Sequence, residues 1–233
     1  MGDIKEEIIL QKKIRRRLIK VILFIIILLV VAISWVLFFY STSQGPITKP
    51  IIYIYPQEET EVSVKVGYPD SLTCTYPKYE NGWDVIASPD GNLKDVKTGR
   101  NLYALYWEGI RTKEGNIEDG FVVKGENVAR FLEEKLEILG LNEREAEEFI
   151  VYWLPQMEKN KYNYIRFETK EEIETEMPLG IEPKPDTVIR VLMDWKALDE
   201  KIEVKEQKLE KTERKGYTVV EWGGSELKEN IVR

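Results

Sequence analysis

Hydrophobic residues are concentrated in one continuous run near the amino terminus, at residues 21–40. Ser34 is the single polar residue in this run, and none of its residues is charged. At about 1.5 Å per residue, a helix of this length just crosses a hydrocarbon core of roughly 30 Å. Trp35 and Tyr40 lie near its outer end, where aromatic rings suit a membrane interface. The pattern therefore predicts a transmembrane helix over Val21–Tyr40, in contact with the lipid bilayer.

The two flanks of this run differ in charge. Six basic residues directly precede it: Lys12, Lys13, Arg15, Arg16, Arg17 and Lys20. Lys49 is the only basic residue among the next twenty. Because basic flanks stay in the cytoplasm, we expect a cytoplasmic segment at residues 1–20 and a single-pass cell-membrane protein with an extracytoplasmic C-terminal domain. A cleaved signal is the alternative, since small residues follow at Ser41–Ser43, although signal sequences usually have shorter apolar regions of about 7–15 residues.

Beyond a polar tether at residues 41–48, short segments have the alternating, β-branched or aromatic composition of strands. They lie at residues 50–56, 61–66, 71–76, 83–87, 102–107, 120–123, 162–167, 187–193 and 217–222. Asn81-Gly82 and Asp90-Gly91 are typical hairpin turns. They predict a meander that places the strand of Trp83 after the strand of Cys74, and we expect the Cys74 thiol to be buried as a small apolar group.

Two segments in the middle of the chain have helical periodicity. Residues 127–139 carry one apolar stripe and end at Gly140, a typical helix stop. Asn142 and Glu145 form a capping-box pattern that opens a second helix. We expect this helix to run to about Trp153 and to end at Pro155.

These elements predict the α+β class, with a mostly antiparallel β-sheet or sandwich and a central helix pair, preceded by one N-terminal transmembrane helix. We expect the extracytoplasmic α+β domain to cover residues 49–224. Loops are predicted at residues 178–185 and 201–215, and a C-terminal tail at residues 225–233.

Charge narrows the possible partners of this domain. The whole chain has a net charge of −7, and the first twenty residues carry seven basic and three acidic side chains, which leaves −11 for residues 21–233. Nucleic acid is excluded as an expected partner, because phosphate binding needs a basic face. A glycan or an envelope protein remains possible. The lone Cys74 and the absence of Asn-x-Ser/Thr sites are typical of a bacterial surface protein.

Four segments together resemble a family of uncharacterised bacterial proteins that begin with Lys-Pro-(Val/Ile)-Ile-Tyr-(Leu/Ile)-Tyr-Pro. They are Lys49–Pro56, Tyr106–Gly109, Phe149–Met157 and Arg214–Gly224. The resemblance spans nearly all of residues 49–224. It implies a single exported domain, and because that family has no established activity, it supplies no catalytic residues.

The absence of histidine excludes most catalytic triads, histidine zinc sites and histidine acid–base catalysis. A glycosidase needs only two carboxylates. Glu108 is the candidate catalytic carboxyl, and Trp107 and Trp222 are candidate ligand-binding rings, because aromatic faces beside a carboxyl suit sugars. The simpler interpretation is that these are core aromatics beside strand-edge carboxylates.

Two further patterns have simpler explanations. Ser225–Lys228 and Lys97–Gly99 match fragments of penicillin-recognising enzymes, but their order is reversed and no S-x-N element exists, which favours chance. Asp90, Asn92 and Asp95 offer oxygens to calcium, but their spacing departs from an EF-hand loop and hairpin turn chemistry is the simpler explanation. We therefore expect no metal site and no cofactor.

The sequence thus predicts a membrane-anchored extracytoplasmic domain that binds or organises a cell-envelope component without catalysis. The alternative is a carboxylate-dependent enzyme acting on glycans. A third possibility is a membrane-tethered partner of another protein.

Overall fold

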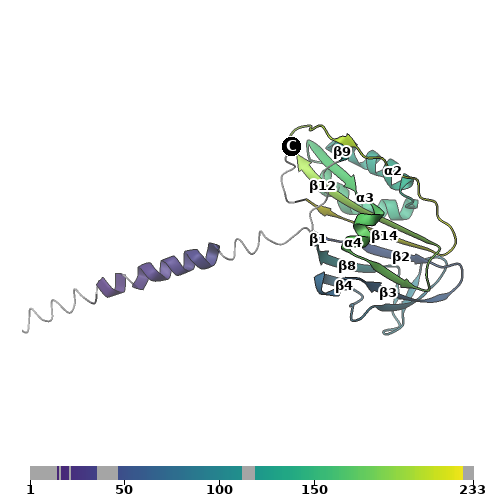
Figure 1. Cartoon of the computed structure of the whole chain (residues 1–233), viewed down its shortest axis with the longest axis horizontal. Helices are drawn as coiled ribbons and strands as arrows, with labels where there is room; N and C mark the ends of the chain where they lie inside the picture. Colours follow the sequence, from purple (N-terminus) through teal and green to yellow (C-terminus); the bar gives the residue numbers. More distant parts are fainter. Residues whose placement is uncertain (1–14, 16, 21, 36–46, 112–118, 228–233) are drawn as a thin grey trace, which may run out of the picture. The chain divides into compact units, whose positions relative to one another are not determined.

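The computed structural model describes residue 15 and residues 17–20, 22–35, 47–111 and 119–227. The chain divides into two compact units, Met1–Gln44 and Gly45–Arg233 (Figure 1).

The first unit contains the helix Arg17–Trp35, which is long and apolar enough to cross a membrane, either as a span or as a signal sequence. Its described apolar side chains are about half exposed or more, which suits a helix surrounded by lipid. Residues 36–40 of the expected span lie outside the described residues.

The described part of the second unit is built on a large sheet. The sheet order is β1-β8-β2-β14-β12-β10-β9-β13, and β4 lies on the free side of β8. The strands are β1 Ile47–Thr48, β2 Ile51–Tyr55, β4 Leu72–Tyr76, β8 Leu105–Ile110, β9 Asp119–Lys124, β10 Tyr162–Phe167, β12 Thr187–Leu198, β13 Lys205–Glu206 and β14 Thr218–Glu226. All pairings are antiparallel except β12 with β14 and β13 with β9.

A smaller antiparallel sheet has the order β11-β3-β5-β6-β7. Its strands are β3 Thr60–Val66, β5 Trp83–Ala87, β6 Leu93–Asp95, β7 Asn101–Leu102 and β11 Leu179–Glu182. Three α-helices are described, α2 Val128–Ile138, α3 Glu143–Met157 and α4 Lys170–Glu176, with 3₁₀ turns η1 Pro69–Ser71 and η2 Gly125–Asn127.

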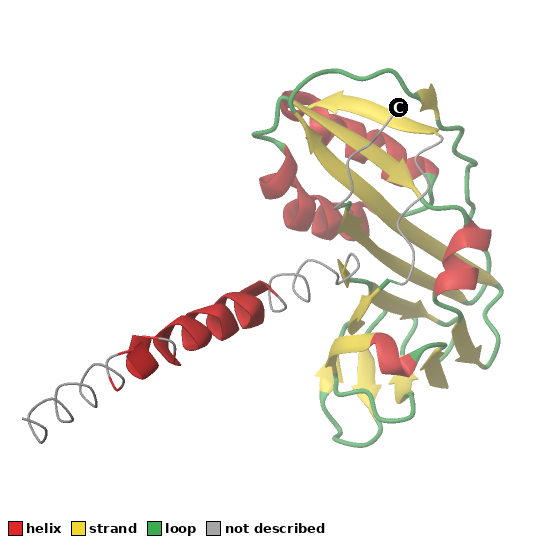
Figure 2. Cartoon of the chain, turned by 60° about the vertical axis from the view of Figure 1, so that its left-hand side comes forward, coloured by secondary structure: helices red, strands yellow, loops and turns green. Residues whose placement is uncertain are grey.

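The two faces of the large sheet are buried in different ways. On one face, a hydrophobic cluster joins α2 and α3 to β12 and β14 through side chains such as Leu132, Phe149 and Trp195. On the other face, a second cluster joins the large sheet to the small sheet through side chains such as Ile54 and Val64. Figure 2 shows the helices behind the upper part of the large sheet and the small sheet below.

The prediction of a mixed α+β chain with mostly antiparallel sheets is confirmed, as is an N-terminal apolar helix. The capping box is also confirmed, since Glu145 N donates to Asn142 Oδ1 over 2.9 Å and Asn142 N donates to a Glu145 carboxylate oxygen. Gly140 follows α2 with φ +96°, as expected of a helix stop.

The predicted meander is wrong in its first pairing. The Cys74 strand, β4, pairs with β8 of the large sheet, whereas the Trp83 strand, β5, pairs with β3 and β6 of the small sheet. Residues 77–82 carry the chain from one sheet to the other, and Trp83 Nε1 fixes this passage by donating to the Pro77 carbonyl over 2.8 Å. Because β4 lies at an edge of the large sheet, the Cys74 thiol is exposed rather than buried.

Several boundaries also differ. Pro155 lies inside α3 and does not end it, since the helix continues to Met157. Residues 178–185 contain β11, so they are not entirely a loop, and residues 201–215 include the short strand β13. β1 begins at Ile47 and β14 ends at Glu226.

Candidate functional site

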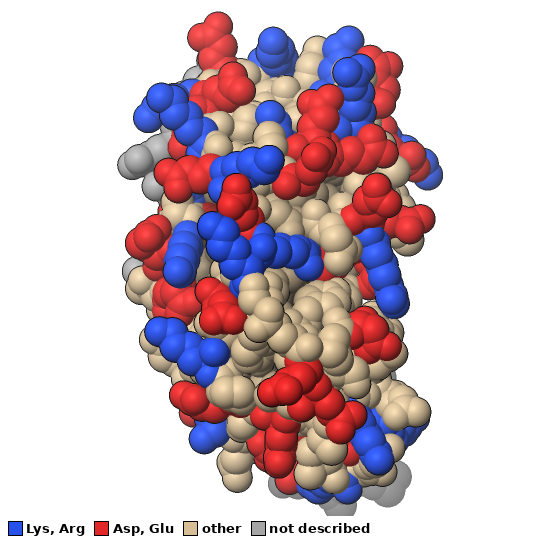
Figure 3. Space-filling view, turned by 90° about the vertical axis from the view of Figure 1, so that its right-hand side faces the viewer, with Lys and Arg blue, Asp and Glu red and all other residues tan. Residues whose placement is uncertain are grey.

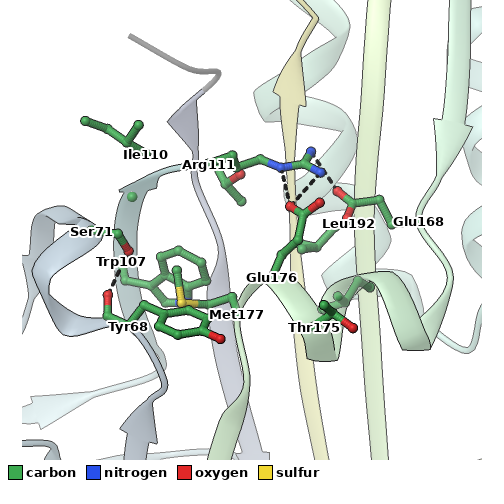
Figure 4. A pocket seen from close by; sticks show the side chains of 13 residues that line it. Tyr68, Ser71, Trp107, Ile110, Arg111, Glu168, Thr175, Glu176, Met177 and Leu192 are labelled. Atoms are coloured by element: carbon green, nitrogen blue, oxygen red, sulfur yellow. Dashed lines mark hydrogen bonds and ion pairs between the residues drawn. The ribbon is translucent and has the colours of Figure 1, made fainter. Parts of the chain in front are cut away.

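A cavity of about 280 Å³ opens between α4 and the strands β8 and β12 (Figure 4). Its lining comes from segments that are far apart in the sequence. The lining residues are Thr48, Tyr68, Ser71, Trp107, Gly109, Ile110, Arg111, Glu168, Ile173, Thr175, Glu176, Met177 and Leu192. The cavity therefore exists only in the folded domain.

The short helix α4 forms one wall of this cavity. It begins with a capping box in which Thr169 Oγ1 accepts from Glu172 N over 3.3 Å and Glu172 Oε2 accepts from Thr169 N over 2.7 Å. Within the helix itself only Ile173 is buried. A helix this short is marginal on its own, so other contacts must hold it on the sheet.

Three arginines supply those contacts. Each has a side chain that is 7% exposed or less, and each binds one carboxylate of α4 and at least one from elsewhere in the fold. The pairs with the helix are Arg166–Glu172 at 3.0 Å, Arg190–Glu174 at 3.1 Å and Arg111–Glu176 at 2.8 Å. The other partners are Asp119 for Arg166, Glu221 for Arg190, and Asp194 and Glu168 for Arg111. Successive acidic residues of α4 thus bind three different buried cations.

The Arg111 cluster is the one that borders the cavity. Arg111 Nη1 lies 2.6 Å from Asp194 Oδ1 and 2.9 Å from Glu168 Oε1. Its Nε and Nη2 lie 2.9 and 2.8 Å from Glu176 Oε2. Figure 4 shows the carboxylates of Glu168 and Glu176 both directed at this guanidinium. Three carboxyl groups therefore share a single positive charge.

Burial makes this imbalance costly and shifts the ionisation of the cluster. Burial first, and then the neighbouring Asp194, raise the pKa of Glu168 to about 8, although Arg111 acts in the opposite direction. Burial likewise raises the pKa of Asp194 above its usual range. Near neutral pH, Glu168 therefore holds a proton.

Two of the hydroxyl groups around the cavity already use their hydrogens. Ser71 Oγ donates to the Tyr68 carbonyl over 2.7 Å, and Thr175 Oγ1 donates to the Glu171 carbonyl over 2.7 Å. What these two hydroxyls still offer is acceptor lone pairs.

Apolar groups complete the cavity. Trp107, Met177 and Leu192 are at most 8% exposed, and Trp107 Nε1 donates to Glu221 Oε1 over 2.9 Å. Gly109 keeps this wall open, because a Cβ there would lie 3.1 Å from the Trp107 ring and 3.3 Å from the Ser71 carbonyl oxygen. The site thus combines an apolar wall with a polar end rich in acceptors.

The three site residues predicted from the sequence do not come together. Trp107 lines the cavity, but Glu108 follows it on β8 and points to the opposite face of the sheet. Glu108 forms an ion pair with Lys49 there. Trp222 is 6% exposed and packs in the helix-covered cluster, with its ring centroid 5.4 Å from that of Phe149.

The calcium candidates are engaged in turns. Asp90 accepts from Asn92 N over 3.1 Å and from Asn92 Nδ2 over 2.7 Å. Asp95 Oδ1 accepts from Lys97 N over 2.8 Å and from Thr98 N over 3.0 Å. Within the described ranges, no group of His, Cys, Asp and Glu has the geometry of a metal site.

The two fragments that match penicillin-recognising enzymes lie in different sheets, and among the described residues neither is a free catalytic pair. Lys97 pairs with Glu80 at 2.5 Å on the surface. Ser225 is buried and shares a hydrogen bond of 2.9 Å with Thr48, while Lys228 lies outside the described residues.

Sequence reasoning missed the charged members of the site. Arg111, Glu168, Glu176 and Asp194 come from four separate segments, and no spacing rule connects them. One signal was present, since the capping-box pattern Thr169-x-x-Glu172 directly after a strand indicates a helix start.

On the face drawn in Figure 3, acidic and basic side chains are interspersed, so neither sign of charge dominates there.

No protein-family model matches the chain, and no solved structure matches it significantly. The chain is similar to an uncharacterized protein in the bglA 3' region of Butyrivibrio fibrisolvens. The two are 38% identical over 68 residues, which cover 28% of this chain and 69% of that protein. On this similarity, the chain belongs to the same family as the uncharacterized protein of Butyrivibrio fibrisolvens.

Proposed function

We propose that the chain is a membrane-anchored extracytoplasmic protein that binds a cell-envelope component, such as a glycan, in the cavity beside α4. One observation carries this proposal: the cavity is walled by apolar groups at one side and by carboxylates and acceptor hydroxyls at the other. Concave sites with a few convergent polar groups are the usual form of ligand pockets.

The membrane topology is part of this proposal. The helix Arg17–Trp35 and the basic residues around its start support an uncleaved anchor with a cytoplasmic amino terminus. Protease added to intact cells should then digest residues 47–227, and a C-terminal portion that is cut only after the cells are opened would contradict the topology.

The finer architecture is also proposed. α2 and α3 would act as the central helix pair, and the two sheets would pack as a sandwich through the cluster that contains Ile54 and Val64. The role of this sandwich would be to support β8 rigidly, because β8 forms part of the cavity wall.

Filling the cavity tests the binding function. Thr175 is exposed on α4 and lines the cavity, so Thr175→Trp should block the cavity without disturbing the core. Thr73→Trp is the matched control, because Thr73 is exposed on β4 and does not line the cavity. The full-length protein in detergent should co-sediment with purified cell-wall polysaccharide, and Thr175→Trp should lose this property while Thr73→Trp keeps it.

Equal sedimentation of both variants would contradict binding in the cavity. Co-purification of a stoichiometric protein companion that Thr175→Trp does not release would favour the third possibility, a tethered partner of another protein.

A carboxylate-dependent glycan-acting enzyme is the second candidate. The observation that favours it is the pKa of Glu168, which is raised to about 8 by burial and by Asp194, so that a protonated acid lies beside the carboxylate of Glu176. The candidate acid is then Glu168 rather than Glu108. Release of sugar by the wild-type chain that disappears in Glu168→Gln and persists in Glu108→Gln would establish the enzyme and exclude the purely binding role.

A further inference from the structure

The chemistry of the cavity walls narrows the class of ligand. We propose that the ligand carries a primary ammonium group, as in an unacetylated amino sugar, and that this group binds the carboxyl groups of Glu168 and Glu176 where they line the cavity. The inference rests on the proposed binding function and specifies it.

The arginine of the site offers little to an anionic ligand. Nε, Nη1 and Nη2 of Arg111 all bind carboxylates of the protein, from Glu168, Glu176 and Asp194, in four contacts that leave one N–H of Nη2. A carboxylate or phosphate on a ligand would find this single N–H and would face three carboxyl groups. The site therefore repels anions although it contains an arginine.

Apart from this N–H of Arg111, the Tyr68 hydroxyl and the proton on Glu168, the polar groups that face the ligand are acceptors. Glu168 and Glu176 supply carboxyl oxygens, and the hydroxyls of Ser71 and Thr175 have already donated to backbone carbonyls. One further acceptor lies behind them, since Asp194 Oδ2 is buried and has no hydrogen-bond partner among the described residues. A ligand rich in donors is required, and an ammonium group with several hydroxyls meets this requirement.

The charge of the Arg111 cluster also favours a cationic ligand. With one guanidinium among three carboxyl groups, the cluster lacks positive charge, and Glu168 compensates by holding a proton near neutral pH. The charged groups facing Glu168 are Arg111, Asp194, Glu176 and Glu172. An arriving ammonium group supplies the missing charge, so the O–H bond of Glu168 breaks and its proton passes to the solvent.

The shape of the site favours an amino sugar over a metal ion or a lysine chain. The guanidinium of Arg111 occupies the centre of the carboxylates, and the described residues contain no metal-binding group. The cavity of about 280 Å³ has an apolar wall that includes Met177 and Leu192, which suits the carbon-rich face of a pyranose.

Calorimetry on the full-length chain in detergent tests this inference with three probes: a glucosamine trimer, an N-acetylglucosamine trimer and trilysine. Near neutral pH the glucosamine trimer should bind roughly tenfold or more tightly than either of the others. Its apparent enthalpy should differ between phosphate and Tris buffers, because a proton is released on binding.

Variants locate the effect. Glu168→Gln imitates the protonated side chain, so the fold should persist while the proton release disappears and the affinity for the glucosamine trimer falls by roughly tenfold. Glu176→Gln should weaken binding similarly. Glu134→Gln is the control, because Glu134 is 57% exposed on α2 and pairs only with Arg130 among the described residues.

The outcomes separate this inference from the proposed function. If the acetylated trimer binds as tightly as the glucosamine trimer and Thr175→Trp abolishes both, the binding function stands and the ammonium proposal is wrong. Tighter binding of trilysine would overturn the choice of an amino sugar. If none of the probes binds and Thr175→Trp still retains cell-wall polysaccharide, the cavity is not the site and both proposals fail.

Discussion

Two helices of this domain begin in the same way but are held in the fold by different forces. α3 and α4 both open with a capping box, at Asn142 and at Thr169. α3 then buries Phe149, Trp153 and Met157 in the core. α4 buries only Ile173 and is fixed by charge pairs with three arginines.

The difference separates a structural element from one that serves a site. Apolar burial is not directional and depends little on pH or on ions. Charge pairs with partly exposed carboxylates depend on both, and a ligand that competes for those carboxylates acts on them directly. The helix beside the cavity is therefore the one whose attachment responds to its surroundings.

The largest effect is expected on the apolar helix. Phe149 of α3 is fully buried and its ring packs against Trp222. Phe149→Ala should therefore lower the free energy of unfolding by about 3–5 kcal/mol. Urea unfolding should show this loss equally at low and high salt. A loss that shrinks with salt would contradict the view that α3 is held by apolar contacts. Val151→Ala is the control, because Val151 is 67% exposed on the same helix.

Removing an arginine should be slightly less costly. Arg111→Met leaves Glu168, Glu176 and Asp194 without their cation, and breaking such a buried pair costs about 3 kcal/mol, the low end of the usual range because Glu168 already holds a proton. The loss should be smaller at low pH, where the remaining carboxylates are protonated. A loss that does not change with pH would show that Arg111 acts through its packing alone.

These two helices also show which parts of the fold the sequence predicts. The apolar stripe and capping box of α3 are local patterns, so its start was correctly placed at Asn142. α4 has one buried apolar residue and therefore no stripe, and its arginine partners lie on other elements, at separations of 6, 16 and 65 residues for Arg166, Arg190 and Arg111. Periodicity detects burial against apolar surface, and it gives no signal for an element that is attached by ion pairs to other elements.

The same limit explains the candidate site. Glu108 and Trp107 are adjacent in the sequence, but alternation along β8 places them on opposite faces. Glu168 and Glu176 share a cavity because β10, α4 and β12 bring them to Arg111. Adjacent residues in the sequence were a poor guide to the members of the site, because consecutive side chains of a strand point to opposite faces of the sheet.

A third test uses pH to measure the charge cluster itself. The pKa of Glu168 is raised by burial and by Asp194 from its ordinary value of 4.5 to about 8, so the folded protein binds more protons than the unfolded chain between these values. The free energy of unfolding should therefore fall as pH rises through this window. Glu168→Gln removes one such group and should reduce the slope. The slope should not vanish, because burial also raises the pKa of Asp194.

An unchanged slope in Glu168→Gln would mean that Glu168 is ionised in the folded protein. The charge imbalance at Arg111 would then be carried by another group. Glu134→Gln should leave the slope as it is, because Glu134 is 57% exposed on the surface of α2.

The smallest effect should be the most local. Thr169→Ala removes the hydroxyl that caps α4, and a lost cap costs about 1 kcal/mol. The carboxylate of Glu172 keeps both groups that hold it in place, the backbone N–H of residue 169 and the bidentate pair with Arg166 at 3.0 Å. Hydrogen exchange should therefore become faster in α4 and stay unchanged in α3. Faster exchange in both helices would show that α4 belongs to the cooperative core, which would remove the distinction between a structural helix and a helix that serves the site.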